Sequence, residues 1–225
     1  NFLITNTDPS RVDATASELR SILKPEFYPF FSDYLVVRRV SLEPNNHRMY
    51  VTLLERMDSA ELLAHIRLTT IGACRRLMDS DKIRTVTGER ALLKSLGTWL
   101  GLVTLAINVP ILLRDLDLKS LIPKAVQEGK LIPIVPFVCK ILESSGHSRV
   151  FRPRNPWTMA MLAQLTELYL LPELKMTLRF EVEVLFKNLQ VHIGEVNDYR
   201  ERFYGNPRVP LLELKRKYVD VNNSM

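Results

Sequence analysis

Residues 26–41, with the sequence EFYPFFSDYLVVRRVS, indicate the fold class of this chain. The large apolar side chains in this stretch recur at spacings of three and four residues, at Phe27, Phe30, Phe31, Tyr34 and Val37. Such spacing makes one wide apolar stripe along a helix, and the stripe must be buried against another element. We therefore predict a helix over residues 26–41.

The helical pattern continues toward both ends of the chain. Residues that favour helix starts and stops divide it into further predicted helices. These run from about residue 10 to 23, from 45 through 54, from 59 through 77, from 87 to the proline at 110, from 117 to the glycine at 129, over 131–142, and from 155 to the proline at 172. Gly97 and Gly101, four residues apart in one of these helices, predict close packing against a second helix.

One segment is ambiguous. Residues 180–184, FEVEV, alternate strictly and read alone as a strand, but no partner strand is visible elsewhere. Apolar residues also recur there at helical spacing, so a helix is the favoured interpretation. After Asn197 the pattern weakens, and we predict a short helix followed by a mobile tail.

These predictions give an all-α chain of about nine or ten helices joined by short breaks. Helix pairs recur about every 40 residues, the period of helical repeats of the HEAT class. We expect about five antiparallel hairpins stacked in a short curved solenoid over residues 1–195, with residues 196–225 as the short helix and tail. A globular helical bundle is the alternative. A solenoid offers an extended concave face, which favours binding over catalysis.

The sequence has no recognisable signature of catalysis. Its four histidines have no metal-ligand spacing, and it has neither a GxGxxG nor a GxxxxGK[ST] phosphate loop. Cys74 and Cys139 are far apart, which indicates a reducing compartment rather than a disulfide framework. The longest apolar run, over residues 99–113, is too short to span a membrane, and no signal peptide is visible. We expect no enzyme activity, cofactor, metal, membrane or small-molecule substrate.

The formal charge of +6 permits contact with nucleic acid. However, the basic clusters are small: Arg38–Arg39, Arg75–Arg76, the set Arg149, Arg152 and Arg154, and residues 215–217. Solvated helix faces are the favoured interpretation of each cluster. Direct RNA binding by a helical-repeat module is the alternative function.

Two segments are candidates for binding proteins. Residues 38–47, RRVSLEPNNH, lie at a helix junction and either form an ordinary polar loop or a docking edge. Residues 151–159, FRPRNPWTM, combine a stiff loop with Trp157, which either anchors a partner or fills the core.

Six segments resemble, in order, one protein family. They are residues 34–45, 92–101, 110–119, 135–144, 155–159 and 180–189. The family is the central domain of the large NOT scaffold subunit of the CCR–NOT deadenylase complex, which is similar to the middle domain of translation initiation factor four-gamma. The resemblance covers roughly residues 26–189.

The resemblance implies a scaffold with two protein partners. One is the deadenylase nuclease subunit that shortens poly(A) tails, and the other is a DEAD-box RNA helicase that represses translation. The scaffold itself does no chemistry but raises the local concentration of these enzymes on an mRNA, which it contacts indirectly. The implied location is the cytoplasm, including mRNA-processing bodies, with the nucleus as a second location.

The resemblance also implies site residues. The candidate helicase-binding residues are Arg39, Ser41, Asn45, Asn46, His47 and Asn108. Here Asn46 replaces the family's usual aromatic residue, and Ile107 and Val109 replace two lysines. The candidate deadenylase-binding residues are Phe151, Pro153, Asn155, Pro156, Trp157 and Met159.

Overall fold

The computed structural model describes residues 2–5 and 7–204, and every regular element within these ranges is a helix. The α-helices are α1 (Phe2–Thr5), α2 (Val12–Ile22), α3 (Tyr28–Asp33), α4 (His47–Met57), α5 (Ala60–Asp79), α6 (Thr87–Leu102), α7 (Leu118–Glu128), α8 (Leu131–Glu143), α9 (Pro156–Tyr169), α10 (Met176–Leu189) and α11 (Ile193–Tyr204). Short 3₁₀ turns are η1 (Pro25–Phe27), η3 (Pro44–Asn46), η4 (Asp81–Arg84), η5 (Leu105–Ile107) and η6 (Ser144–His147), and η2 (Tyr34–Val40) is a π-helical turn.

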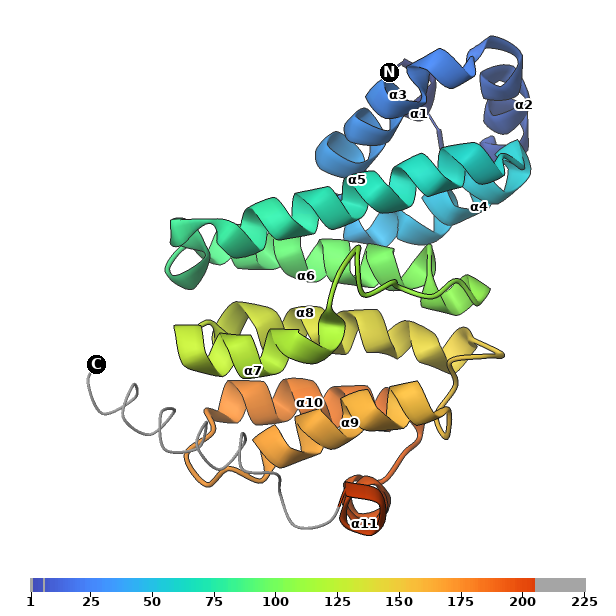
Figure 1. Ribbon diagram of the computed structural model, residues 1–225. Helices are drawn as coiled ribbons and strands as arrows, with labels where there is room; N and C mark the ends of the chain where they lie inside the picture. Colours follow the sequence, from blue (N-terminus) through green and yellow to red (C-terminus); the bar gives the residue numbers. More distant parts are fainter. Residues whose placement is uncertain (1, 6, 205–225) are drawn as a thin grey trace.

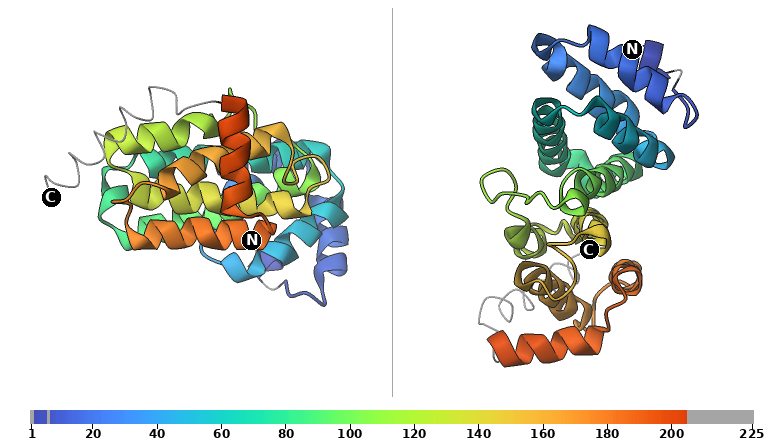
Figure 2. Two further views of the ribbon diagram at one scale, coloured as in Figure 1. Left: turned by 90° about the horizontal axis from the view of Figure 1, so that it is seen from below. Right: turned by 90° about the vertical axis from the view of Figure 1, so that its right-hand side faces the viewer.

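The helices stack in layers from the N-terminal to the C-terminal end of the molecule (Figure 1). Helix α2 packs on α4, α3 on α5, α5 on α6, α6 on α8 and α8 on α10. Helix α11 closes the far end by running across α9 (Figure 2). This is a helical-repeat solenoid, so the predicted fold class is confirmed.

Several helix ends lie where local signals predicted them. The Ser59 hydroxyl accepts the Leu62 N–H at 3.2 Å, and the Asp117 carboxylate accepts the Ser120 N–H at 3.3 Å. The Asn155 side chain accepts the Trp157 N–H at 2.8 Å. Gly129 ends α7 in the left-handed conformation, with φ of 65°. These side-chain caps and this glycine satisfy backbone groups that a helix end leaves unpaired.

The helix predicted over residues 26–41 is continuous but changes its winding. It starts as the 3₁₀ turn η1, continues as α3 and ends as the π turn η2. In η2 the Ser41 N–H donates to the Val36 carbonyl, five residues earlier, at 3.1 Å. The wider turn shifts the side chains that follow it, and such turns are frequent at functional sites.

The prediction that the helix beginning at residue 87 ends at Pro110 is wrong. Helix α6 ends at Leu102, because Thr104 leaves the helical conformation, with φ of −129° and ψ of −88°. Asn108 then reverses the chain with φ of 64°. The ambiguous residues 180–184 lie inside α10, where Val182 is buried, so the helical interpretation is confirmed. Helix α11 extends beyond Asn197 to Tyr204, and the predicted tail lies outside the described residues.

Helices α6 and α8 form the middle of the stack, and two glycines let their backbones approach closely. A Cβ atom on Gly97 would lie 2.8 Å from the Phe137 carbonyl oxygen. A Cβ atom on Gly101 would lie 2.7 Å from the Ile141 carbonyl oxygen. Both distances are too short for a real side chain, so the predicted role of these glycines in helix packing is confirmed.

The segment Thr87–Ile107, which contains α6, is long and apolar enough to cross a membrane by length and composition. In this structure, 56% of its most apolar stretch is buried inside the molecule. Trp99 and Leu100 are fully buried there. By this burial the segment packs as a core helix in this fold, and its length and composition alone are weak evidence for a membrane span.

Candidate functional site

A hydrogen-bonded network holds the first candidate segment, residues 38–47. The Arg39 guanidinium pairs with the Glu43 carboxylate at 3.0 Å, and the Tyr50 hydroxyl donates to the same carboxylate at 2.5 Å. Burial, together with the bond to Glu43, raises the pKa of Tyr50 to about 12. The Asn46 amide also donates to Glu43, at 3.1 Å. Arg39 and Asn46 therefore shape the edge of the junction through bonds within the chain.

His47 lies in the core beneath this segment. Only 2% of its surface is exposed, and its Nε2 donates to the Val40 carbonyl at 2.8 Å. Its ring lies 5.6 Å from the ring of Trp99, and burial lowers its pKa. The expectation that His47 offers a polar contact to a partner is therefore wrong, because the side chain does not reach the surface.

The accessible part of the segment faces a hollow between η2, α5 and α6. The hollow has a volume of about 470 Å³. Arg38, Ser41 and Leu42 line one side of it, and Arg76, Leu77 and Leu92 line the others. Leu42 is 63% exposed. Among the predicted residues, Ser41 lines this hollow, while Asn45 is exposed nearby on η3.

The residues that α5 and α6 contribute were missed by the sequence reasoning. Arg76 was noted only as part of a basic cluster, and Leu92 only as the first residue of the segment 92–101. Nothing in the sequence relates them to residues 38–42, because only the packing of α5 and α6 against η2 brings them together.

Asn108 braces the second candidate segment rather than the first. Its side-chain oxygen accepts hydrogen bonds from the Ser148 hydroxyl at 3.0 Å, the Arg149 N–H at 2.8 Å and the Val150 N–H at 3.0 Å. We therefore group Asn108 with the loop that precedes α9.

Most residues predicted to bind the deadenylase have structural roles. Asn155 caps α9, and Met159 is buried. Trp157 is half-buried against the core, and its ring meets that of Phe151 edge-on at 5.8 Å. Pro156 is exposed and Pro153 is partly exposed. The structure thus favours the interpretation in which Trp157 fills the core.

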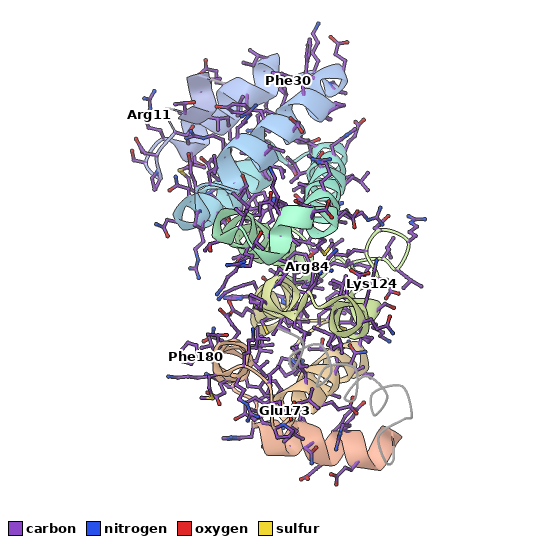
Figure 3. All side chains as sticks on the ribbon, turned by 90° about the vertical axis from the view of Figure 1, so that its left-hand side faces the viewer. Arg11, Phe30, Arg84, Lys124, Glu173 and Phe180 are labelled. Atoms are coloured by element: carbon purple, nitrogen blue, oxygen red, sulfur yellow. The ribbon has the colours of Figure 1, made fainter. Side chains whose placement is uncertain are left out.

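An exposed apolar pair on α10 lies outside both predicted segments. Met176 is 76% exposed and Phe180, one helical turn later, is 64% exposed. Figure 3 shows Phe180 pointing away from the stacked helices. A signal was present in the sequence: once Val182, Leu185 and Leu189 are assigned to the buried stripe of α10, Met176 and Phe180 are left over on another face.

Comparison with known proteins assigns the chain to a family. The model of the CCR4-NOT transcription complex subunit 1 CAF1-binding domain matches residues 1–202. The chain belongs to this family. The match includes both candidate segments and α10.

Three relatives of the CAF1-binding domain illustrate the similarity. The general negative regulator of transcription subunit 1 of Schizosaccharomyces pombe is 32% identical over 216 residues, which are 96% of this chain and 10% of the relative. The CCR4-NOT transcription complex subunit let-711 of Caenorhabditis elegans is 36% identical over 204 residues, which are 87% of this chain and 8% of the relative. The general negative regulator of transcription subunit 1 of Saccharomyces cerevisiae is 34% identical over 190 residues, 84% of this chain and 9% of the relative. The chain thus spans about a tenth of the length of these proteins.

Proposed function

We propose that this domain is a non-catalytic scaffold that binds the CAF1 deadenylase subunit and a DEAD-box RNA helicase within the CCR4-NOT complex. The observation that carries the proposal is the match of a CAF1-binding family model to nearly all of the described chain. The solenoid shape supports it, because stacked repeats present extended surfaces to partners. By holding a nuclease and a helicase together, the scaffold raises their local concentration on one mRNA. It would act in the cytoplasm, including mRNA-processing bodies.

For the helicase, we propose the hollow between η2, α5 and α6. It offers an exposed leucine, Leu42, beside the guanidinium groups of Arg38 and Arg76. An apolar anchor ringed by charged groups is typical of protein interfaces. The resemblance of residues 39–45 to the helicase-facing edge of the family supports this placement.

For the deadenylase, we propose the C-terminal half of the stack. Its exposed apolar side chains include Met176 and Phe180 of α10, which are the most exposed large apolar residues that the structure describes from α8 onward, and Pro156 at the start of α9. Met and Phe are enriched in the buried centres of interfaces, so the α10 pair is the stronger anchor. Trp157 and Phe151 then support this surface from within by fixing the start of α9.

The proposal is tested by pull-down of purified deadenylase subunit and, in a separate lane, of purified helicase core at near-physiological salt. We expect this chain to retain both. Leu42→Glu is expected to weaken helicase retention at least about tenfold, because it places a charge in a desolvated contact, and to leave the deadenylase bound. Leu113→Glu is the matched control, because Leu113 is also an exposed leucine, at 72%, and does not line the hollow. Retention of neither partner by the unchanged chain would contradict the proposal.

A further inference from the structure

Three arginines face solvent around one hollow beside the start of α9. Arg149, Arg152 and Arg154 are exposed, and they line an open hollow of about 590 Å³ together with Val150, Pro153 and Asn155. None of the described residues that line this hollow carries a carboxylate. Within residues 2–5 and 7–204, none of the ion pairs involves these arginines. Their positive charge is therefore locally unbalanced.

Some basic groups near the middle and the end of the stack are paired within the chain. Lys94 of α6 pairs with Glu181 of α10, Lys140 pairs with Glu143, and Arg200 pairs with Glu167. The loop differs from other sites with unpaired basic groups because its three arginines line a single hollow. Concentrated positive charge of this kind attracts an anionic partner.

The backbone that carries the arginines is rigidly held. Besides the three bonds accepted by Asn108, the Ser148 hydroxyl accepts the Phe151 N–H at 2.8 Å. The Asn155 amide donates to the Val150 carbonyl at 2.9 Å, and the Thr158 hydroxyl donates to the Phe151 carbonyl at 2.7 Å. A loop fixed before binding loses less conformational entropy when a ligand arrives.

Arg154 occupies a backbone conformation that disfavours it. Its φ is 84°, in the left-handed region that glycine adopts without cost. Glycine there would remove the strain but also the guanidinium. A strained residue whose side chain faces an open hollow points to a function for that side chain.

We propose that this hollow binds the phosphate backbone of single-stranded RNA. Guanidinium groups match phosphate oxygens through paired hydrogen bonds, and three of them on one short loop suit a ligand with repeated negative charge. Among the described residues that line the hollow, Val150 and Pro153 are the apolar ones, and neither is the large apolar anchor that protein partners use. The inference concerns this loop alone and does not depend on deadenylase or helicase binding.

The contact is expected to be independent of base sequence. The two nearby aromatic rings, Phe151 and Trp157, pack against each other and the core, so they offer no stacking platform for bases. Affinity then comes from phosphate contacts alone. For three neutralised phosphates on a single strand, the slope of log affinity against log salt is expected to be about −2.

Fluorescence anisotropy with labelled 20-nucleotide poly(A) and poly(U), over about 50–150 mM KCl, tests this inference on the whole chain. The test variant combines Arg149→Gln, Arg152→Gln and Arg154→Gly. The control combines Arg11→Gln, Arg48→Gln and Arg84→Gln, which removes the same charge from exposed arginines that no described ion pair uses. Figure 3 shows Arg11 and Arg84 at separate places on the surface.

We expect similar affinity for both RNAs and a loss of at least about tenfold in the loop variant at 100 mM salt, against about twofold or less in the control. Thermal melts establish whether both variants are folded. If the triple loop variant does not fold, the single variant Arg152→Gln replaces it in the binding measurement. Equal losses in the two variants, or no RNA binding by the unchanged chain, would overturn the inference. So would tighter binding of a poly-glutamate peptide through the same arginines, which would make the hollow a site for acidic protein segments.

Discussion

His47 shows how one residue can be misjudged from its neighbours in sequence. It follows the polar run EPNN, which favours a loop, so the histidine was expected at the surface. The structure places it at the first turn of α4, facing Trp99 of α6. The helix was predicted from residue 45 and begins two residues later, at His47. The tertiary contact with Trp99 of α6 decides that the His47 side chain points inward.

The buried His47 predicts a pH dependence of stability. Burial lowers the pKa of the folded histidine below its usual value of 6.5. As the pH falls below that value, the unfolded chain takes up a proton that the folded chain does not, so stability decreases. We expect unfolding by urea at pH 5.5 and 7.5 to show this decrease in the unchanged chain and a smaller decrease in His47→Gln, whose amide can still donate to the Val40 carbonyl. An equal decrease in the unchanged chain and in His47→Gln would show that His47 is not the source of the pH dependence.

Gly97 provides a second prediction at the residue scale. The Cβ atom of Gly97→Ala would meet the backbone of α8, so we expect a loss of about 1–3 kcal/mol in the free energy of unfolding. Gly72→Ala in α5 is the control, because its Cβ atom would meet only the end of the Arg76 side chain, at 3.6 Å. There alanine is expected to stabilise the helix by about 0.5–1 kcal/mol. Urea unfolding measures the free energy of unfolding of the two variants. No change in this free energy for Gly97→Ala would contradict the close approach of α6 and α8.

At the scale of elements, the predictable features were those with local causes. Asp117 and Gly129 bound α7 because a side-chain cap and a left-handed residue act within a few positions. The end of α6 at Leu102 was not predictable in this way, because Pro110 is the nearest obvious helix breaker and the chain leaves the helix eight residues before it. Likewise, the candidate hollow beside Leu42 joins residues from three elements, which no local pattern relates.

The loop before α9 carries a prediction at this scale. Asn108→Gly keeps the positive φ but removes the oxygen that accepts the Arg149 and Val150 N–H groups. We expect these two amides to exchange hydrogen at least about fivefold faster, as the loss of about 1 kcal/mol per bond implies. Asn108→Asp keeps an acceptor oxygen and is expected to retain most of the protection. Unchanged exchange in Asn108→Gly, measured by mass spectrometry, would show that other contacts hold the loop.

At the scale of the whole molecule, helical periodicity predicted an all-α chain, because each amphipathic helix must bury its apolar stripe. The recurrence of helix pairs about every 40 residues favoured the solenoid over a globular bundle, which only the structure excluded. The binding surfaces needed the structure. Phe180 belongs to a segment whose alternation alone reads as a strand, so its place on the exposed face of a helix followed only once residues 180–184 were assigned to α10 (Figure 3). Conversely, the sequence left open whether Trp157 anchors a partner or fills the core, and the structure places it half-buried against the core.

The measurement that tests the central claim most directly is a calorimetric titration of this chain with purified CAF1-type deadenylase subunit. We expect saturable one-to-one binding, weakened at least about tenfold by Phe180→Glu, because a charge then replaces an apolar anchor. Phe30→Glu is the matched control, since Phe30 is 66% exposed at the opposite end of the stack, and it is expected to bind as the unchanged chain does. Absence of binding by the unchanged chain would contradict the scaffold function, and equal binding by both variants would contradict the placement on α10.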